Sequence, residues 1–357
     1  MSAVVSLPLA STGTRRLALL GTGTVGSAFV ERYAALQDRG VTLPSFSWLA
    51  NSRTARACEQ TPADELAQAN LAARGAVALQ PWAEAEGLQR GDVVVDATAS
   101  DAVADWHEQW LARGVHVVTA NKLGQGAQLA RAQAIADSGQ QGAAHYGDSA
   151  TVGAGLPLLS SLRALVAGGD RIHRVEGVLS GSLAWLFHHY DGQRPFSAWV
   201  HEAAEAGYTE PDPRVDLSGE DIRRKLLILA RASGIALRAE QVQVASLVPD
   251  TLAALSPADA LAQLSLLDAP LQRYWQQADD QGGCLRFVGG FDHAGASVGL
   301  RVLSLDHPLA GGSQTDNRVA IHSDRYHAQP LLIQGPGAGA EVTAAALLDD
   351  VLAIVRR

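Results

Sequence analysis

The sequence predicts an α/β fold, with a Rossmann-type parallel-sheet domain followed by an α+β domain. An apolar strand, a glycine-rich turn and a helical pattern follow one another near the N-terminus. Apolar strands then alternate with helical segments as far as residue 122, which is typical of a parallel sheet. The pattern changes at a loop rich in small residues, and a chain of 357 residues is long enough for a further domain.

The first strand, residues 17–20, leads into a turn with a nucleotide-binding pattern. Its three glycines fit the dinucleotide fingerprint, which permits a tight turn, a close approach of pyrophosphate and tight helix packing. The helix that follows would hold the pyrophosphate at its N-terminus. The alternative is a glycine-rich turn without a ligand. The residues expected to contact a cofactor here are Gly21, Gly23, Thr24, Val25 and Gly26.

The second strand, residues 45–50, should end beside the adenosine ribose. An acidic residue there would select NAD(H), but the chain carries Asn51, Ser52 and Arg53, with Arg56 close behind. A guanidinium can pair with a 2′-phosphate, so the sequence favours NADP(H) and leaves NAD(H) possible. The alternative is an ordinary surface arginine at the start of a helix.

Two strong apolar strands follow, at 93–95 and 115–118, with a helix expected at 102–113 between them. Open α/β sheets bind ligands beyond the carboxyl ends of their strands. The segment Thr98-Ala99-Ser100 and the segment 119–122 should therefore face the nicotinamide. Lys122 could meet the phosphates, a substrate carboxylate or a reacting carbonyl oxygen, or it could be a surface lysine that caps a helix.

The small-residue loop around residues 142–157 marks the junction between the domains. A C-terminal glycine turn, 335–340, precedes a last helix at 341–355. The second domain mixes helices and strands, as expected for an α+β lobe packed on one face of a sheet. Its expected helices are 158–167, 197–206 and 218–233, and its expected strands are 171–179, 285–288 and 296–303.

The segment 207–221 concentrates charge on a rigid turn ahead of an apolar helix. Glu210 and Asp216, held by two prolines, could bind an ammonium group or be solvated loop acids. Ser218 and Asp221 form a capping pattern that predicts Ser218 as the helix N-cap. Asp221 and Lys225 are four residues apart, so they share one helix face. They form either a surface salt bridge or an acid and base pair at a cleft.

Composition excludes several other classes of protein. A formal charge of −9 argues against nucleic acid as the main partner. Two cysteines and the spacing of the histidines predict neither a disulfide framework nor a structural metal site. No apolar run approaches the roughly 20 residues of a membrane helix, and residues 1–14 resemble a short disordered tail more than a signal peptide. We therefore expect a cytoplasmic protein.

These motifs together resemble homoserine dehydrogenase, in particular the dehydrogenase portion of the bifunctional aspartokinase/homoserine dehydrogenases. The resemblance runs through the whole chain, and its most specific part is the segment 207–231. The other matching segments are 21–26, 50–53, 117–122, 151–157, 178–183, 337–339 and 343–344.

The resemblance implies reduction of L-aspartate 4-semialdehyde to L-homoserine with NADPH or NADH, in the route to threonine and methionine. Lys225 would be the catalytic lysine and Lys122 the second candidate proton donor, with Asp221 beside them. Either lysine would stabilise the developing oxyanion, and the resemblance leaves open which one donates the proton. The implied substrate contacts are Ser182, Tyr208, Glu210, Asp216, Asp221 and Lys225.

The same resemblance implies that the C-terminal helix folds back onto the first domain. The nucleotide-binding domain would then comprise residues 15–147 and 335–357, with Gly337 at the cofactor. Residues 148–334 would form the catalytic and dimerisation domain, and a homodimer would pair through the sheet of that domain.

Two features depart from the family pattern. Many members carry a glutamate or another polar residue three positions before the valine of the Thr-Val-Gly-Ala-Gly motif, where it helps to bind a monovalent cation. Here Ser149 stands there, beside Asp148, which argues against a bound cation, although the carbonyls of Val152 and Ala154 could line a site. The sequence also has no kinase domain ahead of it and no ACT domain after it, so we expect no threonine feedback of that kind.

Two alternatives compete with an NADP-preferring homoserine dehydrogenase. Another Rossmann dehydrogenase of an amino-acid aldehyde would not account for the segment 208–225. A noncatalytic NADP-binding sensor on the same fold should have lost the charged residues of the site, yet Lys122, Glu210, Asp221 and Lys225 are all present.

Overall fold

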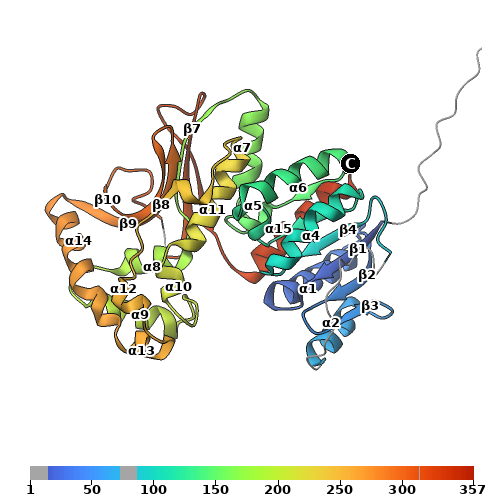
Figure 1. Ribbon diagram of the computed structural model, residues 1–357, viewed down its shortest axis with the longest axis horizontal. Coiled ribbons are helices and arrows are strands. Elements are labelled where there is room, and N and C mark those ends of the chain that lie inside the picture. Colours follow the sequence, from blue (N-terminus) through green and yellow to red (C-terminus); the bar gives the residue numbers. More distant parts are fainter. Residues whose placement is uncertain (1–14, 73–86, 313) are drawn as a thin grey trace, which may run out of the picture.

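The computed structural model describes residues 15–72, 87–312 and 314–357 (Figure 1). The predicted tail at 1–14 lies outside these residues. Two domains lie side by side, each built around a six-stranded sheet. Within the described ranges, no helix combines the length and apolarity that a membrane crossing requires.

The sheet of the first domain has the strand order β3-β2-β1-β4-β5-β6. Strands β1, β2, β4, β5 and β6 run parallel, and β3 pairs antiparallel at one edge. The order reverses at β1, which is where sheets of this type bind ligands. The strands are β1 (Arg16–Leu20), β2 (Ser45–Ala50), β3 (Ala55–Ala57), β4 (Val93–Asp96), β5 (His116–Thr119) and β6 (Tyr146–Gly147).

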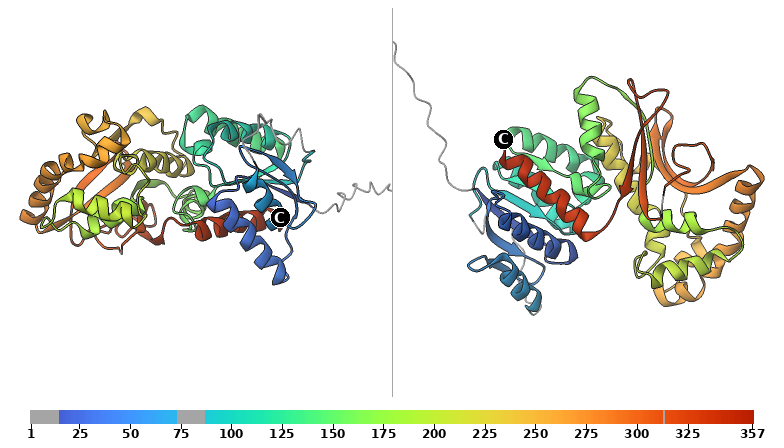
Figure 2. Two further views of the ribbon diagram at one scale, coloured as in Figure 1. Left: turned by 90° about the horizontal axis from the view of Figure 1, so that it is seen from below. Right: turned by 180° about the vertical axis from the view of Figure 1, so that it is seen from behind.

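Helices cover both faces of this sheet, and its central strands are accordingly mostly apolar. Leu17 and Leu19 pack on the side of α1 and the C-terminal helix α15, whereas Ala18 and Leu20 pack on the side of α4 and α6. Figure 2 shows α15 running beside α1, although the two helices lie at opposite ends of the sequence. The helices are α1 (Thr24–Asp38), α2 (Pro62–Leu71), α4 (Asp101–Ala112), α5 (Leu123–Gly126), α6 (Leu129–Gly142) and α15 (Ala340–Val355).

The sheet of the second domain has the order β12-β11-β7-β9-β10-β8 and is antiparallel except where β8 joins β10. The helices α8, α11 and α14 pack on one face and enclose the largest apolar core. The strands are β7 (Ile172–Val178), β8 (Val242–Val244), β9 (Gly283–Asp292), β10 (Gly295–Ser304), β11 (Asp316–Ser323) and β12 (Leu331–Pro336). The helices are α7 (Leu158–Ala167), α8 (Gly181–His189), α9 (Phe196–Glu205), α10 (Arg214–Leu217), α11 (Glu220–Ala232), α12 (Asp250–Ala253), α13 (Pro257–Ala262) and α14 (Asp268–Asp280).

One local prediction was wrong. Ser218 does not cap α11: Gly219 is the N-cap, and its φ of +79° favours glycine. The Ser218 hydroxyl accepts the N–H of Glu220 at 3.2 Å and donates to Val215. The alternative interpretation of Arg53, a surface arginine at the start of a helix, does not hold, because the chain turns back into β3.

Asp350 of α15 connects the last helix to the domain junction. Its carboxylate accepts the Ser149 N–H at 2.9 Å and the Ser149 hydroxyl at 2.8 Å. Burial, the largest influence, raises the pKa of Asp350 to about 6 despite these bonds, and Asp148 adds to the rise. The charged form of Asp350 is therefore disfavoured in the folded protein.

This raised pKa predicts a pH dependence of stability. The folded state binds the Asp350 proton more tightly than the unfolded chain, so the free energy of unfolding falls as pH rises from about 4 towards 7. In Asp350→Asn this part of the fall should be absent. Urea unfolding at several pH values measures it, with the exposed neighbour Asp349→Asn as the control. An unchanged pH dependence in Asp350→Asn would contradict the assignment.

Candidate active site

The glycine turn between β1 and α1 has the shape of an anion cradle. A side chain on Gly21 would lie 2.7 Å from the Ala97 carbonyl oxygen, and one on Gly26 would lie 2.0 Å from that of Gly21. Gly23, by contrast, faces open space. No side chain caps α1, and its first turn contains no acidic residue. Its free N–H groups can therefore bind a pyrophosphate, and the turn fits a dinucleotide.

The predicted ribose-binding turn is held together by Asn51. Its amide donates to the Thr22 hydroxyl at 2.8 Å and to the Ala69 carbonyl, and its side-chain oxygen accepts the N–H of Arg53 at 2.8 Å. Ser52 is exposed. Among the described residues, the Arg53 guanidinium has no hydrogen-bond or ion-pair partner, whereas Arg56 pairs with Glu65 at 2.7 Å. Arg53 is thus the arginine available to a ligand at this turn.

The two strand-end segments lie together because β4 and β5 are adjacent and parallel. Thr98, Ala99 and Ser100 follow β4, and Lys122 follows β5. The Ser100 hydroxyl accepts the N–H of Val103 as the N-cap of α4, so it is committed to the helix. Ala99 is the exposed member of the first segment.

Lys122 and Lys225 meet at one carboxylate across the domain boundary. Lys225 Nζ lies 2.9 Å from Asp221 Oδ2, and Lys122 Nζ lies 3.5 Å from Asp221 Oδ1. They are the two lysines of the whole sequence. Lys122 comes from the nucleotide-binding domain, whereas Lys225 and Asp221 stand on the first turns of α11. We refer to these three residues as the lysine cluster.

The electrostatics of the lysine cluster favour an ionised Asp221. Burial alone would raise the pKa of Asp221, but the charges and hydrogen bonds of Lys225 and Lys122 outweigh it and hold that pKa well below its usual range. Lys225 is itself only 8% exposed. A buried ammonium costs several kcal/mol unless it is paired, so Lys225 depends on its partners.

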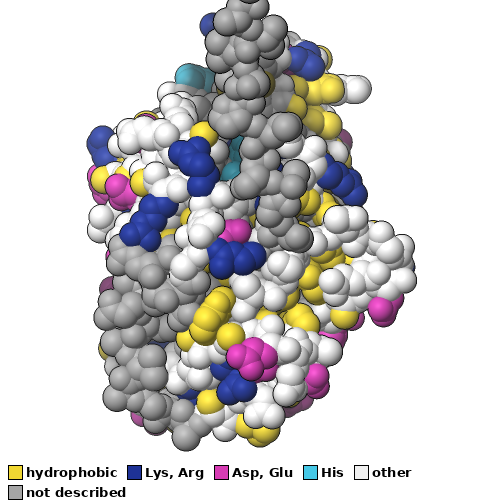
Figure 3. Space-filling view, turned by 90° about the vertical axis from the view of Figure 1, so that its right-hand side faces the viewer, with side chains coloured by type: hydrophobic (Ala, Val, Ile, Leu, Met, Phe, Trp, Pro, Cys, Tyr) yellow, Lys and Arg dark blue, Asp and Glu magenta, His cyan; other side chains and the backbone are white. Residues whose placement is uncertain are grey.

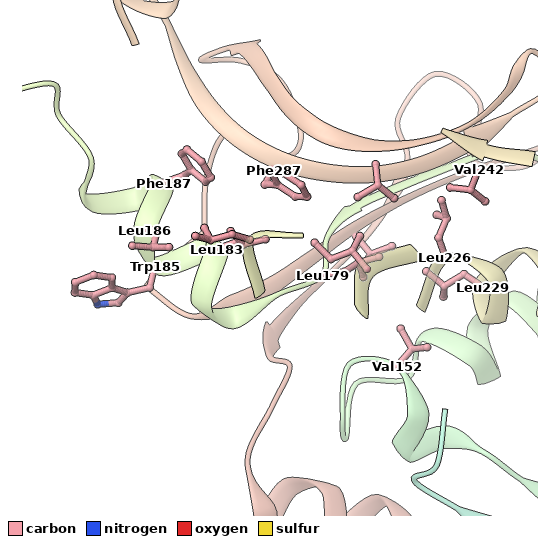
Figure 4. Close-up of a cluster of buried hydrophobic side chains, with 14 of the residues drawn as sticks. Val152, Leu179, Leu183, Trp185, Leu186, Phe187, Leu226, Leu229, Val242 and Phe287 are labelled. Carbon is pink, nitrogen blue, oxygen red and sulfur yellow. The ribbon is translucent and has the colours of Figure 1, made fainter. Parts of the chain in front are cut away.

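The second partner of Lys225 is the carbonyl of Leu179, which accepts from Nζ at 2.7 Å. The Leu179 side chain lies between Leu183 of α8 and Leu226 of α11, which anchors the turn between β7 and α8 (Figure 4). In the first turn of α8, which follows directly, the Ser182 hydroxyl donates to Asp216 Oδ1 at 2.7 Å. The segment from Leu179 to Ser182 therefore links Lys225 to the charged segment 207–221, which we refer to as the charged loop.

Asp216 organises the predicted substrate loop. Its Oδ2 accepts the N–H of Glu210 at 2.8 Å while its Oδ1 holds Ser182. The carboxylate of Glu210 is exposed, and the Tyr208 ring, also exposed, lies 5.4 Å from the ring of Trp185. The structure thus brings Ser182, Glu210 and Asp216 together, and Lys225 binds the backbone three residues before Ser182.

Arg231 is a residue of the domain boundary that sequence reasoning missed. From α11 its guanidinium donates to the carbonyls of Gln125 and Ala127, the latter at 2.9 Å. These carbonyls belong to α5 and the residue after it, just beyond Lys122, and α5 packs beside α11 (Figure 1). An arginine in an amphipathic helix carries no signal of such a contact in the sequence.

The loop considered for a monovalent cation holds an ion pair of its own. Arg163 binds Asp148 through two contacts of 2.7 Å, and Ser149 is bound to Asp350. Val152 and Ala154 are buried. Across the described ranges, no group of three or more His, Cys, Asp or Glu side chains could hold a metal ion. The carboxylate of Asp148, the acid beside this loop, is already paired with a guanidinium.

Gly337 lies where the chain leaves β12 for α15. A side chain there would overlap Asn317, whose Oδ1 would lie 1.1 Å away, so only glycine fits. This close packing sets the path by which the C-terminal helix returns to the first domain. Figure 3 shows the outer end of that domain, where basic and acidic side chains are interspersed and several lie beside one another.

The chain matches two family models. Residues 21–146 match the model "Homoserine dehydrogenase, NAD binding domain", and residues 157–352 match "Homoserine dehydrogenase". The homoserine dehydrogenase of Emericella nidulans is 35% identical over 96% of this chain and 98% of its own length. A bifunctional aspartokinase/homoserine dehydrogenase of Zea mays is 46% identical over 73% of this chain, but that match spans only 29% of the longer relative.

Solved structures agree in fold. A Candida auris protein of unknown function is 34% identical, with a TM-score of 0.84 over 96% of this chain and 98% of that one. A hyperthermophilic archaeal homoserine dehydrogenase in complex with NADPH has a TM-score of 0.73 over 96% of this chain and 98% of that one, at 21% identity. Its likeness concerns the fold. The chain belongs to the homoserine dehydrogenase family, with a nicotinamide-cofactor domain and a second domain that carries the charged loop and most of the lysine cluster.

Proposed function

We propose that the protein reduces L-aspartate 4-semialdehyde to L-homoserine with a nicotinamide cofactor, in the route to threonine and methionine. The observation that carries the proposal is the lysine cluster, because two ammonium groups from different domains meet beside the strand ends where the nicotinamide would lie. The domains would be 15–147 with 335–357, and 148–334. Neither a noncatalytic NADP-binding sensor nor another Rossmann dehydrogenase of an amino-acid aldehyde explains the lysine cluster together with the charged loop.

The charged loop would hold the amino-acid end of the substrate. Glu210 offers an exposed carboxylate to the α-ammonium group, and Ser182 offers a hydroxyl. Asp216 fixes the distance between them through its two hydrogen bonds. Tyr208, whose ring lies beside that of Trp185, would pack over the substrate.

The lysine cluster would act on the aldehyde. A bound reduced nicotinamide supplies the hydride to the carbonyl carbon, and the carbonyl oxygen gains negative charge. Lys122 and Lys225 stabilise that charge, and one of them donates the proton that completes the alcohol. Asp221 keeps both ammonium groups in place, and the Leu179 carbonyl fixes the direction of Lys225. The Gly21–Gly26 turn, Thr98–Ser100 and Gly337 would hold the cofactor.

A test of substrate class uses the reverse reaction. L-Homoserine with NADP⁺ should produce NADPH, whereas 4-hydroxybutanoate, which lacks the ammonium group, should react far more slowly. Glu210→Gln should reduce the difference between the two rates, because it should weaken the binding of homoserine alone. Equal rates with the two alcohols in the wild type would contradict a site built for an amino acid.

We further propose that the enzyme prefers NADPH through Arg53. Arg53→Ala should raise the KM for NADPH about tenfold or more, because a charge-assisted hydrogen bond contributes about 1.5–3 kcal/mol. NADH lacks the 2′-phosphate and serves as the internal control, since its KM should change little. Steady-state kinetics with both cofactors measures the effect. An equal loss with both would show that Arg53 does not bind the phosphate.

We also infer that catalysis needs no monovalent cation. Arg163 already neutralises Asp148 beside the loop that contains Val152 and Ala154. Replacing sodium and potassium with choline at constant ionic strength should leave kcat unchanged. Activity that returns only when potassium or sodium is added back would contradict this inference.

Finally, we propose a cytoplasmic homodimer that pairs through the sheet of the second domain. One face of that sheet has a groove of about 410 Å³. In the groove Glu176, only 4% exposed, lies 3.2 Å from Arg174 and 3.6 Å from Arg301. A second copy on this face would cover the groove and its ion pairs.

A further inference from the structure

A hydrogen-bonded network of three polar side chains, Asp96, His107 and Tyr146, runs beneath the two strand-end segments of the cofactor site. Asp96, at the end of β4, and His107, in α4, are both fully buried. His107 Nε2 lies 3.0 Å from Asp96 Oδ2, and His107 Nδ1 lies 3.0 Å from the Tyr146 hydroxyl. None of these side chains has a part in the proposed chemistry, and burying them is costly unless each hydrogen bond is made.

The direction of the hydrogen bonds in this network follows from Asp96 at one end and Tyr146 at the other. Burial, together with the nearby charges of Asp148 and Asp96, raises the pKa of Tyr146 well above its ordinary value, so the phenol keeps its proton. The Asp96 carboxylate can only accept, so His107 Nε2 carries a proton and donates it to Asp96 Oδ2. In a neutral imidazole Nδ1 is then the acceptor, and the protonated Tyr146 hydroxyl donates to it. The tautomer of His107 is therefore set by Asp96 on one side and matched by Tyr146 on the other.

The Asp96 carboxylate also accepts hydrogen bonds from both strand-end segments. Its Oδ1 accepts the N–H of Thr98 at 2.8 Å, and its Oδ2 accepts the amide of Asn121 at 3.0 Å. The same amide donates to the Ser100 carbonyl at 2.8 Å. One carboxylate thus ties the segment after β4 to the segment after β5, and the next residue after Asn121 is Lys122.

At the other end of this network of side chains, His107 and Tyr146 pack directly against α5. A side chain on Gly124 would lie 2.4 Å from the Tyr146 hydroxyl oxygen and 3.1 Å from His107 Nδ1. Helix α5 begins immediately after Lys122, so it rests on the His107 and Tyr146 pair without a gap. Lys122 is therefore held from both sides, through Asn121 before it and through Gly124 after it.

We propose that His107 is a positioning residue of the active site, which orients the Asp96 carboxylate and through it places the cofactor-facing segments and Lys122. The proposal rests on the proposed function for the role of Lys122. A displacement of about 1 Å in a reacting group can reduce a rate by about a hundredfold, so a buried support of this kind matters for kcat.

The test compares Tyr146→Phe and His107→Phe with His116→Phe. His116 is a buried histidine at the opposite end of β5, where its Nδ1 accepts the N–H of His145. Each variant is titrated with NADPH alone, by the fluorescence of the bound cofactor, and is then assayed with L-aspartate 4-semialdehyde. Melting temperatures report any general loss of stability.

Tyr146→Phe and His107→Phe should weaken NADPH binding severalfold and lower kcat about tenfold, with little change in the KM for the aldehyde. His116→Phe should lose stability without either effect. Wild-type NADPH affinity and kcat in the first two variants, or equal losses in His116→Phe, would overturn the proposal. Should His107→Phe not fold, Tyr146→Phe decides. Should the wild type fail to reduce the aldehyde, the NADPH titrations still test the support of the cofactor segments.

Discussion

Lys225→Ala is expected to lower kcat by about 10²–10³, the usual effect of removing one donor from a developing oxyanion. Lys225 is the more deeply buried lysine, and its Nζ is fixed by Asp221 at 2.9 Å and by the Leu179 carbonyl at 2.7 Å. An ammonium group held in this way is already placed for the aldehyde oxygen, so little of its stabilising effect is lost to reorganisation. Steady-state and single-turnover rates of NADPH oxidation measure the loss.

Arg224→Ala is the matched control for Lys225→Ala. It removes a positive charge from the same helix, but the Arg224 side chain is exposed. Its kcat should stay close to that of the wild type, and NADPH should bind all three proteins alike. A similar loss of kcat in both variants would mean that α11 contributes only its overall charge.

Lys122→Ala should have the second-largest effect, a loss of about a hundredfold in kcat. Lys122 lies 3.5 Å from Asp221 and is the only member of the lysine cluster from the nucleotide-binding domain. Its removal also leaves Asp221 with a single cation, so Lys225 should be held less firmly. Lys122→Arg, which keeps the charge, should recover part of the rate, and an Arg variant no better than Ala would argue against an electrostatic role.

Added ethylamine distinguishes the two lysines. A small amine can enter the space left by a missing side chain and act as a proton donor there. The alanine variant of the donating lysine should be rescued in proportion to amine concentration, whereas the variant of the other lysine should respond weakly. Failure of both variants to respond would point to a donor other than a lysine.

The sequence allowed parts of this site to be predicted because some signals are local. The Gly21–Gly26 turn has a strand before it and a helix after it, and Asp221 and Lys225 are one helical turn apart. Both patterns depend only on the geometry of one or two elements. The Ser218 cap was wrong for a local reason as well, since glycine at the next position supplied the left-handed backbone that the start of α11 uses.

Contacts that cross the fold could not be predicted from local patterns. Lys122 and Asp221 lie in different domains, and their contact depends on how α5 packs beside α11. The role of the Leu179 carbonyl leaves no signal in the sequence, because every residue has a backbone carbonyl. His107 reads as one more helical residue until β4 and β6 place Asp96 and Tyr146 on either side of it. Such contacts are set by tertiary packing.

The most direct test of the account is the initial rate of NADPH oxidation with L-aspartate 4-semialdehyde, measured for the wild type and Lys225→Ala at equal saturation with cofactor. We expect turnover by the wild type, homoserine as the product, and a rate at least about a hundredfold lower in the variant. A wild type that binds NADPH but does not turn over would contradict the proposed function. An unaffected variant would contradict the role of the lysine cluster.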